Sequence, residues 1–334
     1  MAPTPPARVA ACIVTHDSAA DVAACLAALA AQDHSPLEVV LVDCASRDGT
    51  LEAARAAAGG LRLDLVALAE NRGFAGGMNA ALARSDAPYV LSLNPDARPS
   101  PAYVACLLER LEAHPQLQVG AVTGRLLRPA APGEPPRLDA CGMRLTPAWR
   151  HLDRGSGEID RGQLSLPERV FGCTGAASLF RRRALDDAAV GGEVFDSAFH
   201  SFREDAELCL RLRERGWEIL YEPTARAVHG RRVLPERRRG LPAAVNFHSL
   251  KNRYLLRCGH QRVGNLVRTL PWTLTRDLGA LAWVVARERS SLAAYGWLWR
   301  HRRELRQRRR ALRASATAPA AAVERWFAVE GEPV

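Results

Sequence analysis

Asp96 is a carboxylate in a position where α/β proteins bind ligands. The apolar run 89–93 predicts a buried strand, and Asn94-Pro95 ends it, because proline lacks a backbone donor and restricts the residue before it. Ligands of open α/β sheets gather beyond the carboxyl ends of strands. Asp96 is therefore a candidate ligand-binding residue. The alternative is an Asp that caps the helix expected from about Pro101.

A second acidic group, Glu204, Asp205 and Glu207, stands at the start of a predicted helix that Gly216 ends. Acidic side chains at this end are favoured by the helix dipole, so charge compensation explains them as well as catalysis does. His229 follows the last predicted strand of this region, where a lone histidine is more often structural than a ligand.

The elements that must position these groups alternate along the chain. Apolar runs predict strands at 9–15, 37–43 and 61–67, and periodic segments predict helices that end near residue 31 and span about 51–58. Short connections between alternating strands and helices indicate an α/β fold with a parallel sheet wrapped by helices.

The later part of this region is less regular. Residues 128–168 are rich in Pro, Gly and charge, which predicts a long loop or a pair of edge strands around 138–149. The glycine-broken stretch 170–180 could bring backbone close to a ligand. Two short strands are expected at 219–221 and 225–228.

A glycine-rich segment at 70–79 opens a helix and could cradle a phosphate at the helix N-terminus. Its spacing is Gly-x-x-Gly-Gly, which differs from dinucleotide-binding and P-loop motifs. A plain loop is the alternative.

Composition favours a globular protein of a reducing compartment. Of the residues, 48% are apolar, and the eight cysteines include no Cys-x-x-Cys pair, which fits buried thiols better than disulfides or a zinc site. The N-terminal residues have no apolar segment of signal-peptide length, and the late apolar run 278–286 is too short to span a bilayer. We expect a cytoplasmic protein.

The net charge of +10 is concentrated beyond about residue 230, where arginines alternate with tryptophans. Such helices can lie in a membrane interface, with tryptophan at headgroup depth and arginine on anionic lipid. A solvated amphipathic bundle is the alternative. Nucleic acid is not expected as a partner, because no recognition motif accompanies the charge.

Six segments carry a resemblance to a known family. They are Val-Thr-His-Asp-Ser (14–18), Leu-Val-Asp-Cys-Ala-Ser-Arg-Asp-Gly-Thr (41–50), Glu-Asn-Arg-Gly-Phe-Ala-Gly-Gly-Met-Asn (70–79), Leu-Asn-Pro-Asp-Ala (93–97), Gly-Cys-Thr-Gly-Ala (172–176) and Arg-Glu-Asp-Ala-Glu-Leu-Cys-Leu-Arg-Leu (203–212). In this order they resemble family 2 glycosyltransferases of the GT-A fold, in particular the bacterial rhamnosyltransferase-like branch. The resemblance implies a Rossmann-like, mostly parallel sheet flanked by helices in a catalytic domain over 1–234, and a helical, basic extension over 235–334.

The resemblance also implies roles for single residues on the donor side. Asp96 and His229 would hold a divalent cation, Mg²⁺ or Mn²⁺, that stabilises the departing diphosphate, and Arg231 and Arg232 could further neutralise it. Asn94 stands where the family's Asp-x-Asp signature has its first Asp, which leaves one charge fewer. The residues implied to bind the nucleotide are Thr15, Asp43, Asn71, Gly73, Asn79 and Asn94.

On the acceptor side, the resemblance makes Asp205 the base that takes the acceptor's proton, with Glu204 beside it. Gly175 and Glu207 would contact the acceptor. The family usually has an aromatic residue where Arg203 stands and Asp where Glu207 stands, so the acceptor contacts of this chain differ from the family's pattern.

The function predicted from these residues is inverting transfer of a sugar, with rhamnose a candidate, from a nucleoside diphosphate to a hydroxyl of a cell-envelope or lipid-linked glycan. The transfer would take place at the cytoplasmic face of the plasma membrane, with peripheral contact to anionic lipid. Two alternatives stay open: a nucleotidyltransferase, and a non-catalytic, membrane-docked protein that binds nucleotide or glycan.

Overall fold

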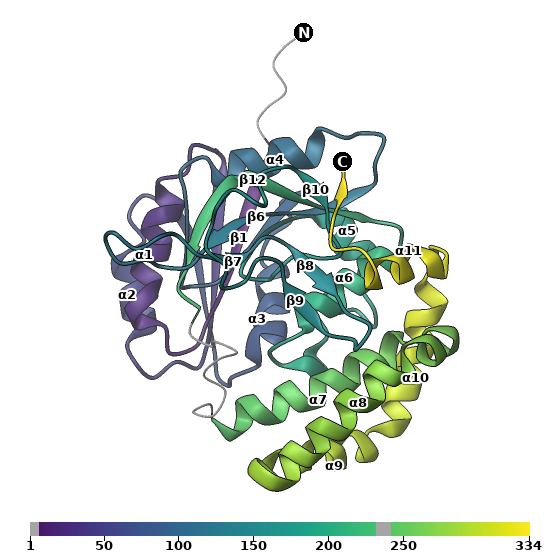
Figure 1. Cartoon of the computed structure of the whole chain (residues 1–334). Helices are drawn as coiled ribbons and strands as arrows, with labels where there is room; N and C mark the ends of the chain where they lie inside the picture. Colours follow the sequence, from purple (N-terminus) through teal and green to yellow (C-terminus); the bar gives the residue numbers. More distant parts are fainter. Residues whose placement is uncertain (1–6, 232–241) are drawn as a thin grey trace.

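The structure is a computed structural model and describes residues 7–231 and 242–334. Within them, the central sheet has eleven strands in the order β13-β10-β12-β6-β11-β4-β1-β2-β3, with β5 paired to β12 and β7 to β6 (Figure 1). The strands of this sheet are β1 (Val9–Thr15), β2 (Leu37–Cys44), β3 (Arg62–Leu68), β4 (Tyr89–Leu93), β5 (Ala97–Pro99), β6 (Val119–Leu127), β7 (Leu138–Ala140), β10 (Glu168–Arg169), β11 (Ala177–Arg181), β12 (Glu218–His229) and β13 (Glu332–Pro333).

The helices lie around this sheet and in a group beside it (Figure 1). They are α1 (Ala19–Ala30), α2 (Thr50–Ala56), α3 (Gly73–Leu82), α4 (Tyr103–Glu112), α5 (Arg182–Ala188), α6 (Glu204–Glu214), α7 (Ala243–His260), α8 (Val263–Arg287), α9 (Ala293–Arg300), α10 (Arg302–Ser315) and α11 (Ala320–Glu324). The predicted α/β fold class with a C-terminal helical extension is confirmed.

The central strand β1 is buried on both faces, as is typical of a parallel strand covered by helices. Val9 and Ile13 pack in one core with α1, α2 and α4, whereas Ala10 and Cys12 pack in the opposite core with α3, α5 and α6. β1 pairs in parallel with β2 and β4, and β2 pairs in parallel with β3. The carboxyl ends of these four strands therefore lie along one edge of the sheet.

The other half of the sheet is mixed. β11 runs antiparallel to both β4 and β6. The two strands predicted at 219–221 and 225–228 are one strand, β12, whose pairing with β6 shifts between Glu222 and Arg226. This irregularity explains the error, because the intervening residues read as a break although the strand continues through a bulge. Residues 128–168, predicted as a long loop or a pair of edge strands around 138–149, contain β7 and the separate hairpin of β8 (Met143–Leu145) and β9 (His151–Asp153).

The C-terminal helices pack against the part of the chain that contains the central sheet. Arg308 on α10 pairs with Asp196 and with Glu207 of α6, and Trp326 is fully buried beneath Arg213 of α6. The last strand, β13, joins the edge of the central sheet through β10. The predicted boundary at residue 234 lies outside the described residues, so the division into two domains stays a prediction.

Candidate active site

The pairing of β5 with β12 brings Asp96 and His229 together. Asp96 directly precedes β5, and His229 lies opposite Ala97 in the antiparallel register. As a result, Nε2 of His229 lies 3.3 Å from Oδ1 of Asp96. The next residue, Gly230, donates its N–H to the backbone oxygen of Asp96 at 2.9 Å, and a Cβ at this glycine would lie 3.2 Å from the Asp96 Cβ. Asp96 and His229, although 133 positions apart in the sequence, thus lie side by side and form one corner of the candidate site.

A further carboxylate, Asp139, fixes the imidazole of His229. Its Oδ2 lies 2.7 Å from Nδ1 of His229, and its Oδ1 accepts a bond from Arg231 at 3.1 Å. Burial opposes a charge on the imidazole, but the bonds to Asp139 and Asp96 outweigh it and raise the pKa of His229 to about 9. Arg231 also pairs with Asp153 at 2.7 Å, so its guanidinium is held beside this corner. Arg232 lies outside the described residues.

The donor set of this corner fits a divalent cation. Across residues 7–231 and 242–334, no three His, Cys, Asp or Glu side chains form a ready-made metal cage. Asp96 and Nε2 of His229 supply two ligands, and Asp139 orients the imidazole from behind, as carboxylates do at metal-binding histidines. Mg²⁺ and Mn²⁺ commonly take their remaining ligands from phosphate oxygens and water.

Asp205 and Glu204 form a second corner at the start of α6. Asp205 is partly exposed, and its carboxylate accepts bonds from the N–H groups of Gly175 at 3.2 Å and Ala206 at 2.7 Å. Burial of the carboxyl outweighs these bonds and raises the pKa of Asp205 to about 6. The side chain of Glu204 is buried, and its Oε2 has no hydrogen-bond partner among residues 7–231 and 242–334; burial together with the charge of Asp205 raises its pKa well above the usual range. With a pKa of about 6, Asp205 is mostly ionised at neutral pH.

The end of β4 connects the two corners. Ser92 donates to the carbonyl oxygen of Gly175 at 2.6 Å, and the N–H of Asn94 donates to the carbonyl oxygen of Ala176 at 2.8 Å. The side-chain amide of Asn94 lies 3.2 Å from Nε2 of His229. The structure therefore brings five of the predicted site residues to the carboxyl end of one buried strand: Asn94, Asp96, Gly175, Asp205 and His229.

A cavity of about 510 Å³ lies where β1, β2 and β3 end. Thr15 and Asp43 do not line it; they are joined by a 2.8 Å hydrogen bond and almost fully buried, so their contact with a nucleotide stays a prediction. The residues that line the cavity follow the ends of the three strands, and of them only Asn71 was predicted to bind the nucleotide. They are His16, Asp17, Ala45, Arg47, Ala69, Glu70 and Asn71.

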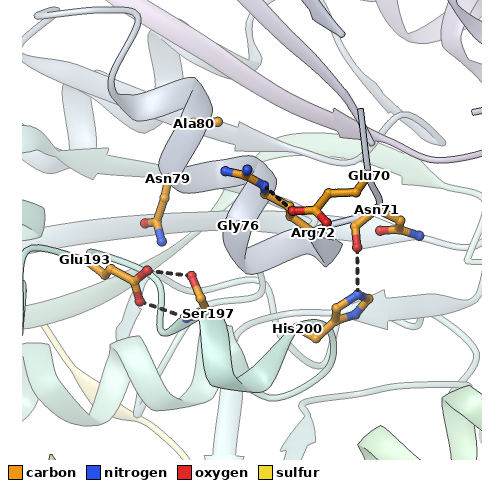
Figure 2. Close-up of a pocket in the computed structure, with 9 residues that line it drawn as sticks. All are labelled: Glu70, Asn71, Arg72, Gly76, Asn79, Ala80, Glu193, Ser197 and His200. Atoms are coloured by element: carbon orange, nitrogen blue, oxygen red, sulfur yellow. Dashed lines mark hydrogen bonds and ion pairs between the residues drawn. The ribbon is translucent and has the colours of Figure 1, made fainter. Parts of the chain in front are cut away.

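A second cavity, of about 420 Å³, adjoins the first at Glu70 and Asn71 (Figure 2). Gly73 starts α3 with a φ of +66°, and a Cβ there would collide with His200 at 2.3 Å. Asn79 lines the cavity, but its amide exchanges two hydrogen bonds with the backbone of Phe195, at 2.6 and 2.9 Å. Gly73 is not one of the lining residues, and for both residues contact with the nucleotide stays a prediction.

Glu207 is separated from these groups. Its carboxylate is 1% exposed and pairs with Arg211 at 2.7 Å, with His260 at 3.2 Å and with Arg308 at 3.0 Å. Burial disfavours the ionised carboxylate, but Arg211 and the other cations outweigh it and hold the pKa of Glu207 well below its usual range. The structure gives Glu207 a role in joining α6 to α7 and α10, and it leaves no exposed surface for the expected acceptor contact.

A strained turn precedes α6 and is held by a residue that sequence reasoning missed. His200, Phe202 and Arg203 have φ angles of 64°, 71° and 75°, which cost about 1–3 kcal/mol each for residues other than glycine. The fully buried Asn252 of α7 points Nδ2 at three carbonyl oxygens of this turn, at 2.7–2.8 Å. Its sequence neighbour Lys251 donates to the carbonyl oxygen of Ala198 at 2.5 Å. The C-terminal extension thus stabilises the turn that presents Asp205.

Replacing Asn252 with Leu should therefore lower kcat by about 100-fold, because a displacement of about 1 Å at a reacting group costs that much. The KM for the donor should change less than kcat, since Asn252 itself lines neither cavity, although His200 of the turn lines the second one. Asn246→Ala is the matched control: this buried asparagine is on the same helix, and its side-chain oxygen has no partner among the described residues. Equal losses of kcat in both variants would contradict a positioning role.

The pH dependence of turnover should follow the raised pKa of Asp205. The predicted base works only as a carboxylate, so kcat/KM should fall about tenfold for each pH unit once the pH is well below 6. Initial rates in constant ionic strength buffers, with the folded state checked by circular dichroism, measure this. A rate that stays flat down to pH 4.5, where about 97% of Asp205 would be protonated, contradicts the assignment.

The comparisons with known proteins agree with this geometry. The family described as Glycosyl transferase family 2 matches residues 10–188, and the chain belongs to this family. Two curated relatives, both N-acetylglucosaminyl-diphospho-decaprenol L-rhamnosyltransferases of Mycobacterium tuberculosis strains, are 30% identical over 225 residues, which cover 61% of this chain and 70% of theirs. The resemblance to the rhamnosyltransferase-like branch is confirmed, and the protein is a glycosyltransferase.

Solved structures support the fold. A mannosyltransferase from Pyrobaculum calidifontis, in complex with GDP-Man and Mn²⁺, has a TM-score of 0.53 and 22% identity, over 94% of this chain and 86% of that one. GalNAc-T7 with UDP, GalNAc and Mn²⁺ has a TM-score of 0.57 and 11% identity, over 75% of this chain and 47% of that one. At these identities the similarity establishes the GT-A fold alone.

Proposed function

We propose that this chain is an inverting glycosyltransferase that moves a sugar from a nucleoside diphosphate to a hydroxyl of a lipid-linked or cell-envelope glycan. The observation that carries the proposal is the position of Asp205. It is a carboxylate with a raised pKa, bonded to Gly175 beside the end of β4, from which Asp96 also projects. A base and a phosphate-binding corner at the end of one strand are the two requirements of direct displacement.

In this mechanism the oxygen of the acceptor hydroxyl attacks the anomeric carbon, and the bond from that carbon to the diphosphate breaks. Asp205 takes the proton of the hydroxyl as the new bond forms. Asp96 and His229 would hold a divalent cation, which supplies Lewis-acid stabilisation for the charge on the departing diphosphate. Asp139 and Arg231 keep the imidazole of His229 turned toward Asp96.

The donor and acceptor classes are supported by the relatives and by the shape of the site. The cavities of about 510 and 420 Å³ together have room for a nucleoside and a sugar. Structural neighbours bind GDP-Man or UDP with Mn²⁺, and the names of the curated relatives specify rhamnose transfer to a lipid-linked N-acetylglucosaminyl diphosphate. A nucleoside diphosphate rhamnose, such as dTDP-rhamnose, and a polyprenyl-linked acceptor are therefore the candidates for this chain.

A panel of nucleotide sugars tests the proposal. The purified protein is incubated with Mn²⁺, each donor and a polyprenyl diphosphate N-acetylglucosamine, and the released nucleotide is identified. We expect acceptor-dependent release of nucleoside diphosphate, strongest with a rhamnose donor. Release of pyrophosphate would instead support a nucleotidyltransferase, and binding without turnover would support a non-catalytic protein.

A further inference from the structure

Three of the four buried residues of helix α8 are polar, and most of its apolar residues are exposed. The buried side chains on it include Asn265, Thr269 and Thr273. Oδ1 of Asn265 accepts a bond from the indole N–H of Trp149 at 2.8 Å, and the hydroxyl of Thr269 lies 3.2 Å from the amide of Gln261. This arrangement is the reverse of a helix that covers a soluble core.

The outer face of α8 is a continuous apolar stripe. Its residues repeat every three or four positions, which places them on one side of the helix, and each is 42–69% exposed. They are Val263, Val267, Leu270, Leu274, Leu278, Leu281 and Val285. From its first to its last residue the stripe spans 22 helical steps, or about 33 Å at about 1.5 Å per step. Contiguous exposed apolar surface of this extent marks an interaction site.

The surroundings of the stripe are aromatic and strongly basic. Trp272, Trp283 and Trp299 are 55%, 40% and 69% exposed. Residues 243–315 contain sixteen Lys or Arg residues against three acidic ones, so the positive charge of the whole chain is concentrated in these helices. Exposed tryptophan beside arginine is typical of surfaces that lie at lipid headgroups. The charge selects an anionic partner, and it disfavours a second copy of this same basic face.

We propose that α8 lies in the plane of an anionic bilayer surface, with the apolar stripe inserted and the surrounding arginines on lipid headgroups. The charged residues in the middle of α8 agree with an in-plane position. Arg276 donates to the carbonyl oxygens of Ala148 and Trp149, and Asp277 pairs with Arg257, so both face the protein. Among the helices described, none is long and apolar enough to cross a membrane.

This surface adjoins the acceptor side of the site. The segment that contacts α8 at Ala148 and Trp149 continues to His151, whose Nδ1 lies 3.3 Å from Arg203. Arg203 directly precedes α6 and the base Asp205. An acceptor that is anchored in the same bilayer would reach Asp205 from this side, a step that rests on the proposed function.

Vesicle sedimentation with the full chain tests the bilayer contact without any substrate. The vesicles are phosphatidylcholine alone, or phosphatidylcholine with about 30% phosphatidylglycerol to give a negative surface. The protein should bind the anionic vesicles, and the triple variant Leu270→Glu, Leu274→Glu, Leu278→Glu should bind about 100-fold more weakly, because three charges would enter the apolar layer. Leu166→Glu, a change at a leucine that is 72% exposed and lies outside the C-terminal helices, should bind like the wild type.

Two outcomes would overturn the proposal. One is equal binding of the triple variant and the wild type to anionic vesicles. The other is a wild-type dimer by light scattering that the triple variant converts to a monomer, together with no vesicle binding, which would assign the stripe to self-association. Release of nucleoside diphosphate without vesicles is measured in parallel, so that loss of the lipid contact is distinguished from failure of the proposed transferase activity.

Discussion

Replacing Asp205 with Asn should lower kcat by about 10²- to 10⁴-fold, the contribution of a general base. The amide cannot take the acceptor's proton, although it fills the same space at the start of α6. Affinity for nucleoside diphosphate should change by less than about twofold, because the residue acts only on the acceptor side of the sugar. Steady-state rates and calorimetric titration of the nucleotide measure the two quantities.

Asp186→Asn is the matched control for this variant. Asp186 is an exposed aspartate on α5, so its replacement makes the same change of charge without touching the site. Its kcat should equal that of the wild type. If Asp205→Asn kept full activity, another group would have to be the base. If both variants lost activity equally, the loss would come from the net charge.

Removing the proposed cation-binding carboxylate Asp96 should have the second large effect on turnover. Asp96→Ala should lower turnover by at least about 100-fold, because the departing diphosphate would lose a stabilisation worth several kcal/mol. A chelator such as EDTA should suppress the wild type to a similar extent, and added Mn²⁺ should restore the wild type but not the variant. Nucleoside diphosphate release measures all three. Unchanged rates in the presence of chelator would contradict a role for the cation.

Asp139→Asn refines this test, because Asp139 contacts the imidazole of His229 and is not itself a predicted ligand. Loss of such an orienting carboxylate typically costs about 10- to 100-fold in metal affinity. The variant should thus regain activity when Mn²⁺ is raised, whereas Asp96→Ala should not. Identical Mn²⁺ dependence of Asp139→Asn and the wild type would show that Asp139 does not orient the ligand.

Local patterns in the sequence predicted the parallel half of the fold well. The strand expected at 89–93 is β4 with those bounds, and the strand expected at 37–43 is β2, which extends by one residue to Cys44. Such strands are continuous apolar runs, so their signal lies in adjacent residues. β12 was predicted as two strands because its bulge interrupts the run, and β13 was not predicted because two residues at the chain end carry no pattern.

The candidate site was predictable only where its residues belong to motifs. Asp96 and Asp205 follow recognisable segments, and the structure places both around the end of β4. Asn252 could not be found in this way, because its function depends on three carbonyl groups about 50 positions earlier in the chain. The burial of Glu207 likewise depends on partners from α7 and α10. The position of Glu207 two residues after Asp205 therefore did not predict these partners.

The central claim is that Asp205 acts as a base on the acceptor while the diphosphate leaves from the side of Asp96 and His229. The anomeric configuration of the transferred sugar, determined by NMR spectroscopy of the product, tests it most directly. A single displacement predicts a configuration opposite to that of the donor. Retention of the donor configuration would contradict this account, because it requires a different route from donor to product.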